Sequence, residues 1–329
     1  MINIRFHIVS LIAVFMALAI GIVAGSTLLD RATVEFLRSS MDRVQGRNDE
    51  LSTANDAYKK ALDRVDSVEA GLTEHVQELL RGTIDGREVV LITMRGLNET
   101  SVSEVSDALS QAGANLRGTL WIEQQFNLNS ANSVVSLAKT FGLPDNSRRE
   151  EVIDLFGSAL TRQSQPVATR EALTDEQLAR SADLIATTER SGFVDWEPRP
   201  QQPANLELGA DARITFVLLT GEQAILGEYA FVMPLARVFG ASDTRLVVAE
   251  MQAHRPLKNS TTPQLPERGT FVSAIRKDQA LNDKVVTLDN ADRLAGKICL
   301  AEIVAGLDDL SSFSFGEGAG AERPFPPKR

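Results

Sequence analysis

A long uncharged segment near the amino terminus constrains this chain more than any other feature. No Asp, Glu, Lys or Arg occurs from Ile8 to Leu29. This run of about 22 residues would span roughly 33 Å as a helix, which matches the hydrocarbon core of a bilayer. A helix of that length with no polar face is unusual inside a soluble protein. The segment therefore predicts either a membrane anchor or an export signal.

Two interpretations of this segment stay open, a cleaved signal peptide and a retained anchor. Ala24 and Ser26 stand at the −3 and −1 positions of a cleavage site after Ser26, as in many signal peptides. The run is longer than the roughly 7–15 residues of a signal-peptide core, which favours a retained anchor at residues 1–29. Arg5 precedes the run and Asp30 follows it, so we expect a single-pass protein of the cell membrane with a cytoplasmic N-terminus and an extracytoplasmic bulk.

Small residues recur at every fourth position within the anchor. Ala13, Ala17, Gly21 and Gly25 share one ridge of a helix. Gly21 and Gly25 form a GxxxG, the spacing that lets two membrane helices approach closely. This small-residue ridge predicts a packing surface for another membrane helix.

A heptad repeat follows the anchor, within residues 30–82. With Val34 taken as position a, the d position of every repeat is apolar. The d residues are Leu37, Val44, Leu51, Tyr58, Val65, Leu72 and Leu79. No proline interrupts the segment, and a sustained period of about 3.5 residues predicts a coiled coil.

The partner of this predicted coil is expected to be a second copy of the chain. Asn48 and Asn55 occupy a positions, where a buried Asn fixes register and favours two parallel strands. The sequence contains no second heptad segment, so we predict a parallel homodimer. The anchor and the coil both favour parallel association. A single amphipathic helix docked on the C-terminal domain is the alternative.

Residues 83–315 have the pattern of an α/β domain. Apolar strands are expected at 88–93, 114–122, 213–221, 244–251 and 284–290. Helical segments separate them, with an inserted helical group between the second and third strands. This alternation predicts an open, mostly parallel sheet with helices on its faces. The Gly- and Pro-rich tail, residues 316–329, is expected to be flexible.

Composition and motifs exclude several functional classes. A net charge of −10 argues against a nucleic-acid surface, and the single cysteine, Cys299, excludes an intramolecular disulfide. Phosphate-binding Gly loops, GxSxG, HExxH and CxxC are absent, so no catalytic residue is assigned and the protein is not expected to be an enzyme. Asp289 and Asp292 follow the last predicted strand, where a helix N-cap is favoured over a pair of functional carboxylates.

Soft metal ligands follow two of the predicted strands. Met94 follows the first strand, and Met251 and His254 follow the fourth. Because the carboxyl ends of parallel strands share one edge, this set of thioethers and imidazole would suit a Cu(I) ion. Gap filling in the core is the alternative for methionine. Cys299, on the apolar face of the last helix, is expected to be a core residue. The pattern requires no cofactor, and copper is the candidate metal.

Two segments carry a resemblance to a known family. They are NIRFHIVSLIAVFMALAIGIVAG near the amino terminus and VVTLDNADRLAGKICLAEIVAG near the end. Together with the order of anchor, coil and α/β domain, they resemble the mycobacterial copper transport protein B family over almost the whole chain. The resemblance implies a role in copper homeostasis or efflux across an actinobacterial envelope. It also implies a link to cell separation, in which the coil is a scaffold for partners that control peptidoglycan hydrolysis.

Two functional hypotheses follow. The first is a membrane-anchored envelope protein of copper homeostasis. The second is a coiled-coil dimeric scaffold that binds envelope or division proteins. A single membrane helix does not form a conduction path alone, and no second apolar run of about 20 residues occurs in the sequence. Direct transport by one copy is therefore not expected.

Overall fold

The computed structural model of the chain divides into two compact units, Met1–Val68 and Glu69–Arg329, and each is described by itself. The residues that the structure describes are 4–73, 80–84, 86–126, 128, 130–166, 173–203, 208, 213–221, 231–242, 244–251, 271–307, 313–316, 321–323 and 326.

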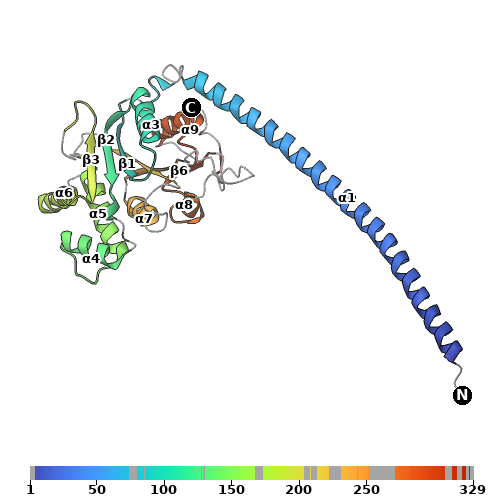
Figure 1. Ribbon diagram of the computed structural model, residues 1–329. Helices are drawn as coiled ribbons and strands as arrows, with labels where there is room; N and C mark the ends of the chain where they lie inside the picture. Colours follow the sequence, from blue (N-terminus) through green and yellow to red (C-terminus); the bar gives the residue numbers. More distant parts are fainter. Residues whose placement is uncertain are drawn as a thin grey trace. The chain divides into compact units, whose positions relative to one another are not determined.

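The amino-terminal part is one uninterrupted helix, α1 (Ile4–Thr73), of 70 residues (Figure 1). No proline interrupts this helix. Several of its hydroxyl side chains donate hydrogen bonds to carbonyls of the preceding turn. Thr53 Oγ1, for example, donates to the Asp49 carbonyl at 2.8 Å. The window Phe6–Gly25 has a mean hydropathy of 2.7, and none of it is buried. The predicted apolar helix, long enough to cross a membrane, is therefore present.

The heptad segment of α1 leaves its large apolar side chains exposed. Leu37, Met41, Val44, Leu51 and Tyr58 are each between 59% and 71% exposed. Their spacing along a continuous helix places them on one stripe, as the heptad predicts. The structure holds a single copy of the chain, so the coiled coil itself stays a prediction.

The second unit is built on one seven-stranded sheet with the order β3-β2-β1-β4-β5-β6-β7. Neighbouring strands are parallel except for β2 and β3, which are antiparallel. The strands are β1 (Glu88–Met94), β2 (Asn115–Ile122), β3 (Val194–Pro198), β4 (Thr215–Thr220), β5 (Arg245–Glu250), β6 (Val286–Leu288) and β7 (Ser314–Phe315). The predicted open and mostly parallel sheet is confirmed.

Helices cover both faces of this sheet (Figure 1). One face carries α3 (Glu99–Gln111) and α9 (Leu294–Gly306). The other carries α4, α5, α6, α7 and α8. Their bounds are α4 (Ala131–Thr140), α5 (Arg149–Gln163), α6 (Asp175–Arg190), α7 (Met233–Ala241) and α8 (Ser273–Lys277), and a short 3-10 turn, η1, spans Gln124–Phe126.

Successive side chains along each strand point to opposite faces of the sheet and so contribute to two separate hydrophobic cores. In β1, Val90 and Ile92 enter the core beneath α5 and α7, whereas Val89 and Leu91 enter the core beneath α3 and α9. Because both faces are covered, the central strands are apolar at nearly every position, which is why they were visible in the sequence as continuous apolar runs.

Two strands were not predicted. β3 alternates buried Val194 and Trp196 with the acidic Asp195 and Glu197, and it ends in Pro198. This is the composition of an edge strand, where charges and proline blunt further pairing. β7 has 2 residues and is too short to give a periodic signal.

Part of the predicted tail returns to the sheet. Within residues 316–329, the Gly316 amide donates to the Arg323 carbonyl at 2.9 Å, and the Glu322 amide donates to the Ser314 carbonyl at 2.9 Å. Glu322 and Arg323 therefore pair alongside β7, and a parallel bridge joins Arg323 to Phe315. The flexibility of the remaining tail residues stays a prediction.

The N-terminus of α9 lies against the loop that leaves β6. A Cβ added at Gly296 would overlap the carbonyl oxygen and carbonyl carbon of Asn290, both backbone atoms. This close approach lets α9 cover Asn290, which is buried. Only glycine fits this contact.

We expect Gly296→Ala to destabilise the α/β unit by about 2–4 kcal/mol, because rigid backbone must move to admit the methyl group. The fluorescence of Trp121 and Trp196, both buried in this unit, reports its thermal unfolding. Gly71→Ala is the matched control, since nothing lies within 4 Å of the added Cβ and alanine favours the helix. Equal melting temperatures for Gly296→Ala and the native chain would contradict the prediction.

Candidate functional site: the carboxyl edge of the sheet

The order of the strands identifies one edge of the sheet as the place to look for a site. The chain proceeds outward from β1 in one direction through β2 and β3, and from β4 in the other direction through β5, β6 and β7. Ligands of open α/β sheets gather beyond the carboxyl ends of the strands, close to such a reversal. The segments 222–230 and 252–270, which follow β4 and β5, lie outside the described residues.

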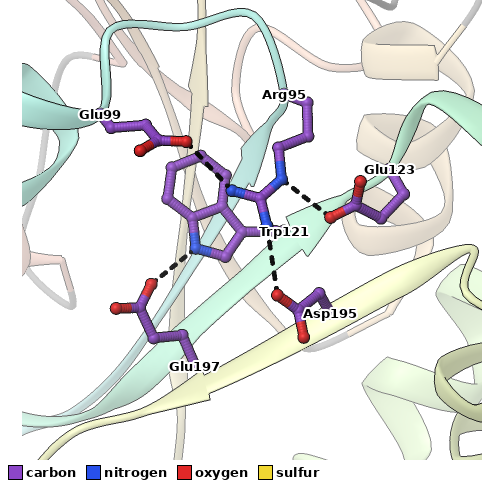
Figure 2. A network of polar contacts seen from close by, with 6 residues as sticks. All are labelled: Arg95, Glu99, Trp121, Glu123, Asp195 and Glu197. Atoms are coloured by element: carbon purple, nitrogen blue, oxygen red, sulfur yellow. Dashed lines mark hydrogen bonds and ion pairs between the residues drawn. The ribbon is translucent and has the colours of Figure 1, made fainter.

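An arginine stands at this edge directly after β1 (Figure 2). The Arg95 guanidinium donates from Nε to Glu123 Oε1 at 2.8 Å. It also pairs with Glu99 Oε1 at 3.3 Å and with Asp195 Oδ2 at 3.2 Å. Glu99 begins α3, Glu123 follows β2, and Asp195 lies on β3. One side chain therefore ties together three strands and a helix.

An indole ring lies beneath this guanidinium. Arg95 Cζ is 4.4 Å from the centroid of the Trp121 ring, a cation–π contact. The ring is buried, and its Nε1–H donates to Glu197 Oε2 at 2.8 Å. The register of β2 and β3 places Asp195 opposite Trp121 and Glu197 opposite Thr119. We call Arg95, Glu99, Trp121, Glu123, Asp195 and Glu197 the Arg95 network.

The charge balance of the Arg95 network is negative. One guanidinium faces the carboxylates of Glu99, Glu123 and Asp195, and a further carboxylate, Glu197, accepts from the indole. The half-buried Glu189 on α6 belongs to the same surroundings. Burial raises the pKa of Glu189, and the negative charge of Asp195 raises it further. This edge therefore favours cations over anions near it.

The donor atoms of the network do not suit a soft ion. Carboxylate oxygens prefer hard cations, whereas Cu(I) prefers sulfur and imidazole. In the part of the chain that the structure describes, no group of three or more His, Cys, Asp or Glu residues could hold a metal ion. The Arg95 network is thus an electrostatic and structural cluster in this structure, with Arg95 already engaged by its neighbours.

A second polar cluster is buried beyond β6. Arg276 Nη1 lies 2.9 Å from Asp289 Oδ2, and both side chains are nearly fully buried, at 3% and 0% exposure. The same guanidinium donates to Thr287 Oγ1 at 3.1 Å and to the Phe315 carbonyl at 2.7 Å. The pair therefore fastens α8, β6 and β7 to one another, and its desolvation is offset by these additional hydrogen bonds.

This cluster corrects the N-cap interpretation of Asp289. The N-cap of α9 is Arg293, with no side-chain cap hydrogen bond, and Asp289 lies in the ion pair. The sequence could not show this, because Arg276 lies outside the local segment in which capping is judged. An asparagine caps α3 in the ordinary way: Asn98 Oδ1 accepts from the Ser101 amide at 3.0 Å.

The described part of the structure does not bring the three predicted metal ligands together. Met94 packs in the core beneath α5 and α7, and Met251 packs in the core beneath α3 and α9, on the opposite face of the sheet. His254 lies outside the described residues. The proposed Cu(I) set therefore stays a prediction that depends on His254.

The cysteine lies where the sequence analysis expected it. Cys299 is fully buried and packs in the core beneath α3 and α9. Burial raises the pKa of its thiol, and the charges of Glu302 and Asp289 raise it further. The thiolate that would bind a metal is therefore strongly disfavoured.

The predicted packing and register residues all lie on α1. A Cβ added at Gly21 or Gly25 would meet nothing within 4 Å, so the small-residue ridge is uncovered in this structure. Asn48 is exposed and Asn55 is half-buried. Their roles in membrane packing and in coil register stay predictions.

A groove of about 490 Å³ lies between α5 and α7. Glu150, Asp154 and Ser158 line one side, and Pro234 and Arg237 line the other. Burial raises the pKa of Asp154, and the neighbouring Glu150 raises it further. Sequence reasoning did not find this groove, because it forms only where two helices distant in sequence pack together.

Comparison with known proteins covers both units at once. The family described as "Copper transport outer membrane protein, MctB" matches residues 1–326. The chain belongs to the MctB family. The chain is 27% identical over 335 residues to the copper transporter MctB of Mycobacterium tuberculosis and to that of Mycobacterium bovis, with 98% of each chain covered. It is 26% identical over 339 residues to the copper transporter MctB of Mycobacterium leprae, again with 98% of each chain covered.

Membership in the MctB family confirms the resemblance stated from the two terminal segments. The family match and the apolar helix Phe6–Gly25 together fit a single-pass membrane protein. The Arg95 network was not expected from the sequence. An arginine directly after a buried strand was its only visible sign, and its partners come from β2, β3 and α3.

We expect Arg95→Gln to lower the stability of the α/β unit by about 1–2 kcal/mol, because the loss of the cation leaves three carboxylates facing one another and removes the contact with Trp121. The loss should shrink in high salt, which screens the repulsion. Arg180→Gln is the control, since the Arg180–Glu176 pair is an exposed pair within one helix. Thermal unfolding at low and high salt measures both, and a salt-independent loss would argue against the electrostatic explanation.

Proposed function

We propose that this protein acts in copper homeostasis as a single-pass, membrane-anchored component of the cell envelope. The observation that carries the proposal is the MctB match over residues 1–326, together with curated relatives that are named copper transporters. The apolar helix Phe6–Gly25 supports attachment to a membrane. By the charges that flank this helix, the α/β unit would lie outside the cytoplasm.

We infer that the protein acts on copper together with other copies or partners. Among the described residues, one helix is long and apolar enough to cross a membrane. A single helix has no interior through which a hydrated or ligated ion could pass. The proposal is therefore a copper-handling protein that works in an assembly, with no enzymatic step of its own.

The scaffold hypothesis gains no support from the relatives, whose printed names all describe copper transport. It remains the alternative in which copper effects would be indirect. Copper binding by the purified chain separates the two, because a scaffold for envelope proteins needs no copper ligand.

Cu(I) competition with a chelator, on the full chain in detergent, tests direct binding. We expect stoichiometric binding that is lost in His254→Ala, since Met94 and Met251 pack in different cores and imidazole is the remaining ligand of the predicted set. His75→Ala, which removes a histidine outside that set, is the control. Binding that is equal in both variants would remove His254 from the site. A native chain that binds no Cu(I) would exclude direct copper chemistry.

We propose further that two copies pair through the heptad of α1. Leu37, Met41, Val44, Leu51 and Tyr58 expose large apolar surfaces along one stripe, and burying each against a partner contributes roughly 1.5–3 kcal/mol. Anchors in the same membrane keep two copies parallel. Asn48 and Asn55 would then meet their own copies at a positions and fix the register.

We expect the full chain in detergent to sediment as a dimer, and Leu37→Glu combined with Leu51→Glu to convert it to a monomer. The glutamates would place like charges opposite each other in the seam, at a cost of several kcal/mol. Thr53→Glu is the control, because heptad position f faces solvent in a coil. A native chain that stays monomeric at high concentration would contradict the proposed dimer.

A further inference from the structure

The unbroken backbone of α1 links the orientation of the membrane anchor to that of the heptad. The helix runs from Ile4 to Thr73 without interruption, through the junction between the apolar segment and the heptad segment. Each residue of an α-helix turns by about 100°. The face that the anchor turns toward a second copy is therefore set by the face that the heptad buries.

The heptad frame can be extended backward through this continuous helix. Positions a and d, counted back from Val34 and Leu37 in steps of seven, pass through the apolar segment. The apolar-segment residues on this seam are Phe6, Val9, Ala13, Met16, Ile20 and Val23, and the polar Thr27 and Asp30 occupy the next a and d positions before the heptad segment. The large apolar ones among them are each between 63% and 78% exposed. The anchor thus carries apolar residues in the same heptad frame as the coil, and the two apolar stretches are separated by Thr27 and Asp30.

The small-residue ridge does not follow this seam. In the same frame Ala13 is at a, but Ala17 is at e, Gly21 at b and Gly25 at f. Positions b and f face away from the partner in a two-stranded coil. Ridge and seam therefore compete, and one pair of unbroken helices cannot bury both along their length.

The energetics favour the heptad seam. In water the burial of apolar side chains drives the coil, whereas lipid tails are as apolar as the side chains they cover and supply no such drive. Close packing at the four small residues, two of which face outward, would contribute less to the stability of the dimer than the heptad seam. To bury Gly21 and Gly25 as well as the heptad seam, the anchor would have to be rotated about its axis relative to the coil, and α1 has no break to supply that rotation.

We propose that the dimer interface crosses the membrane on the Met16–Ile20–Val23 face of the anchor, and that the GxxxG at Gly21 and Gly25 is turned away from the partner copy. This inference rests on the parallel dimer proposed above. The interface then follows one heptad frame from the bilayer into the coil, across the polar Thr27 and Asp30 at the junction.

Cysteine cross-linking of the full chain in membranes tests this interface. Met16→Cys, Ile20→Cys and Val23→Cys place thiols on the seam, and Gly21→Cys and Gly25→Cys place thiols at similar depths on the outer face. The native Cys299 can stay, because its buried, protonated thiol should not cross-link, and the unsubstituted chain verifies this. We expect several-fold faster disulfide formation on oxidation at the seam positions than at Gly21 or Gly25.

Cysteines placed in the heptad segment test the dimer independently of the anchor interface. Leu37→Cys and Leu51→Cys should cross-link, and Thr53→Cys should not. If the coil positions fail to cross-link, the dimer proposal fails. If they succeed while Gly21 and Gly25 react faster than Ile20 and Val23, the dimer stands and the proposed anchor interface is overturned. Equal or absent reaction at all anchor positions also overturns the proposed anchor interface.

Discussion

The continuity of one helix is the constraint on which the amino-terminal unit of this protein depends. Backbone hydrogen bonding from Ile4 to Thr73 leaves no joint between the apolar segment and the heptad segment. The rotation of each part is therefore fixed by the other. In the proposed dimer, two features that look cooperative in the sequence, the small-residue ridge and the heptad, would compete because they share one continuous helix. The same rigidity would connect any event in the membrane to the coil.

The second unit depends on a sheet that is buried on both faces. Because the strand interiors are apolar, the charged groups of the unit collect at the ends of strands. Arg95 joins β1, β2, β3 and α3 in the half of the sheet that ends at β3. Arg276 joins α8, β6 and β7 in the half that ends at β7. The first cluster is partly open to solvent and the second is dry. The buried cluster should therefore be much more sensitive to the loss of one partner.

These clusters bear on how a member of the MctB family could act on copper. The exposed donors at the sheet edge are carboxylates, which suit hard cations. The soft donors that the structure describes in this unit, Met94, Met233, Met251 and Cys299, are packed in two separate cores. Copper chemistry at these four positions would require repacking of a core. A role in an assembly, or ligands supplied elsewhere in the chain, is the more economical interpretation.

The sequence by itself determined the apolar helix, the heptad stripe, the parallel sheet and the family. Each depends on periodicity or on a run of one residue type, which local order records directly. Tertiary structure alone decided that Asp289 pairs with Arg276, that Met94 and Met251 face opposite ways, and that Arg95 gathers carboxylates from separate elements. It also added the edge strands β3 and β7. These features depend on which segments become neighbours after the chain has folded, and no local pattern encodes that choice.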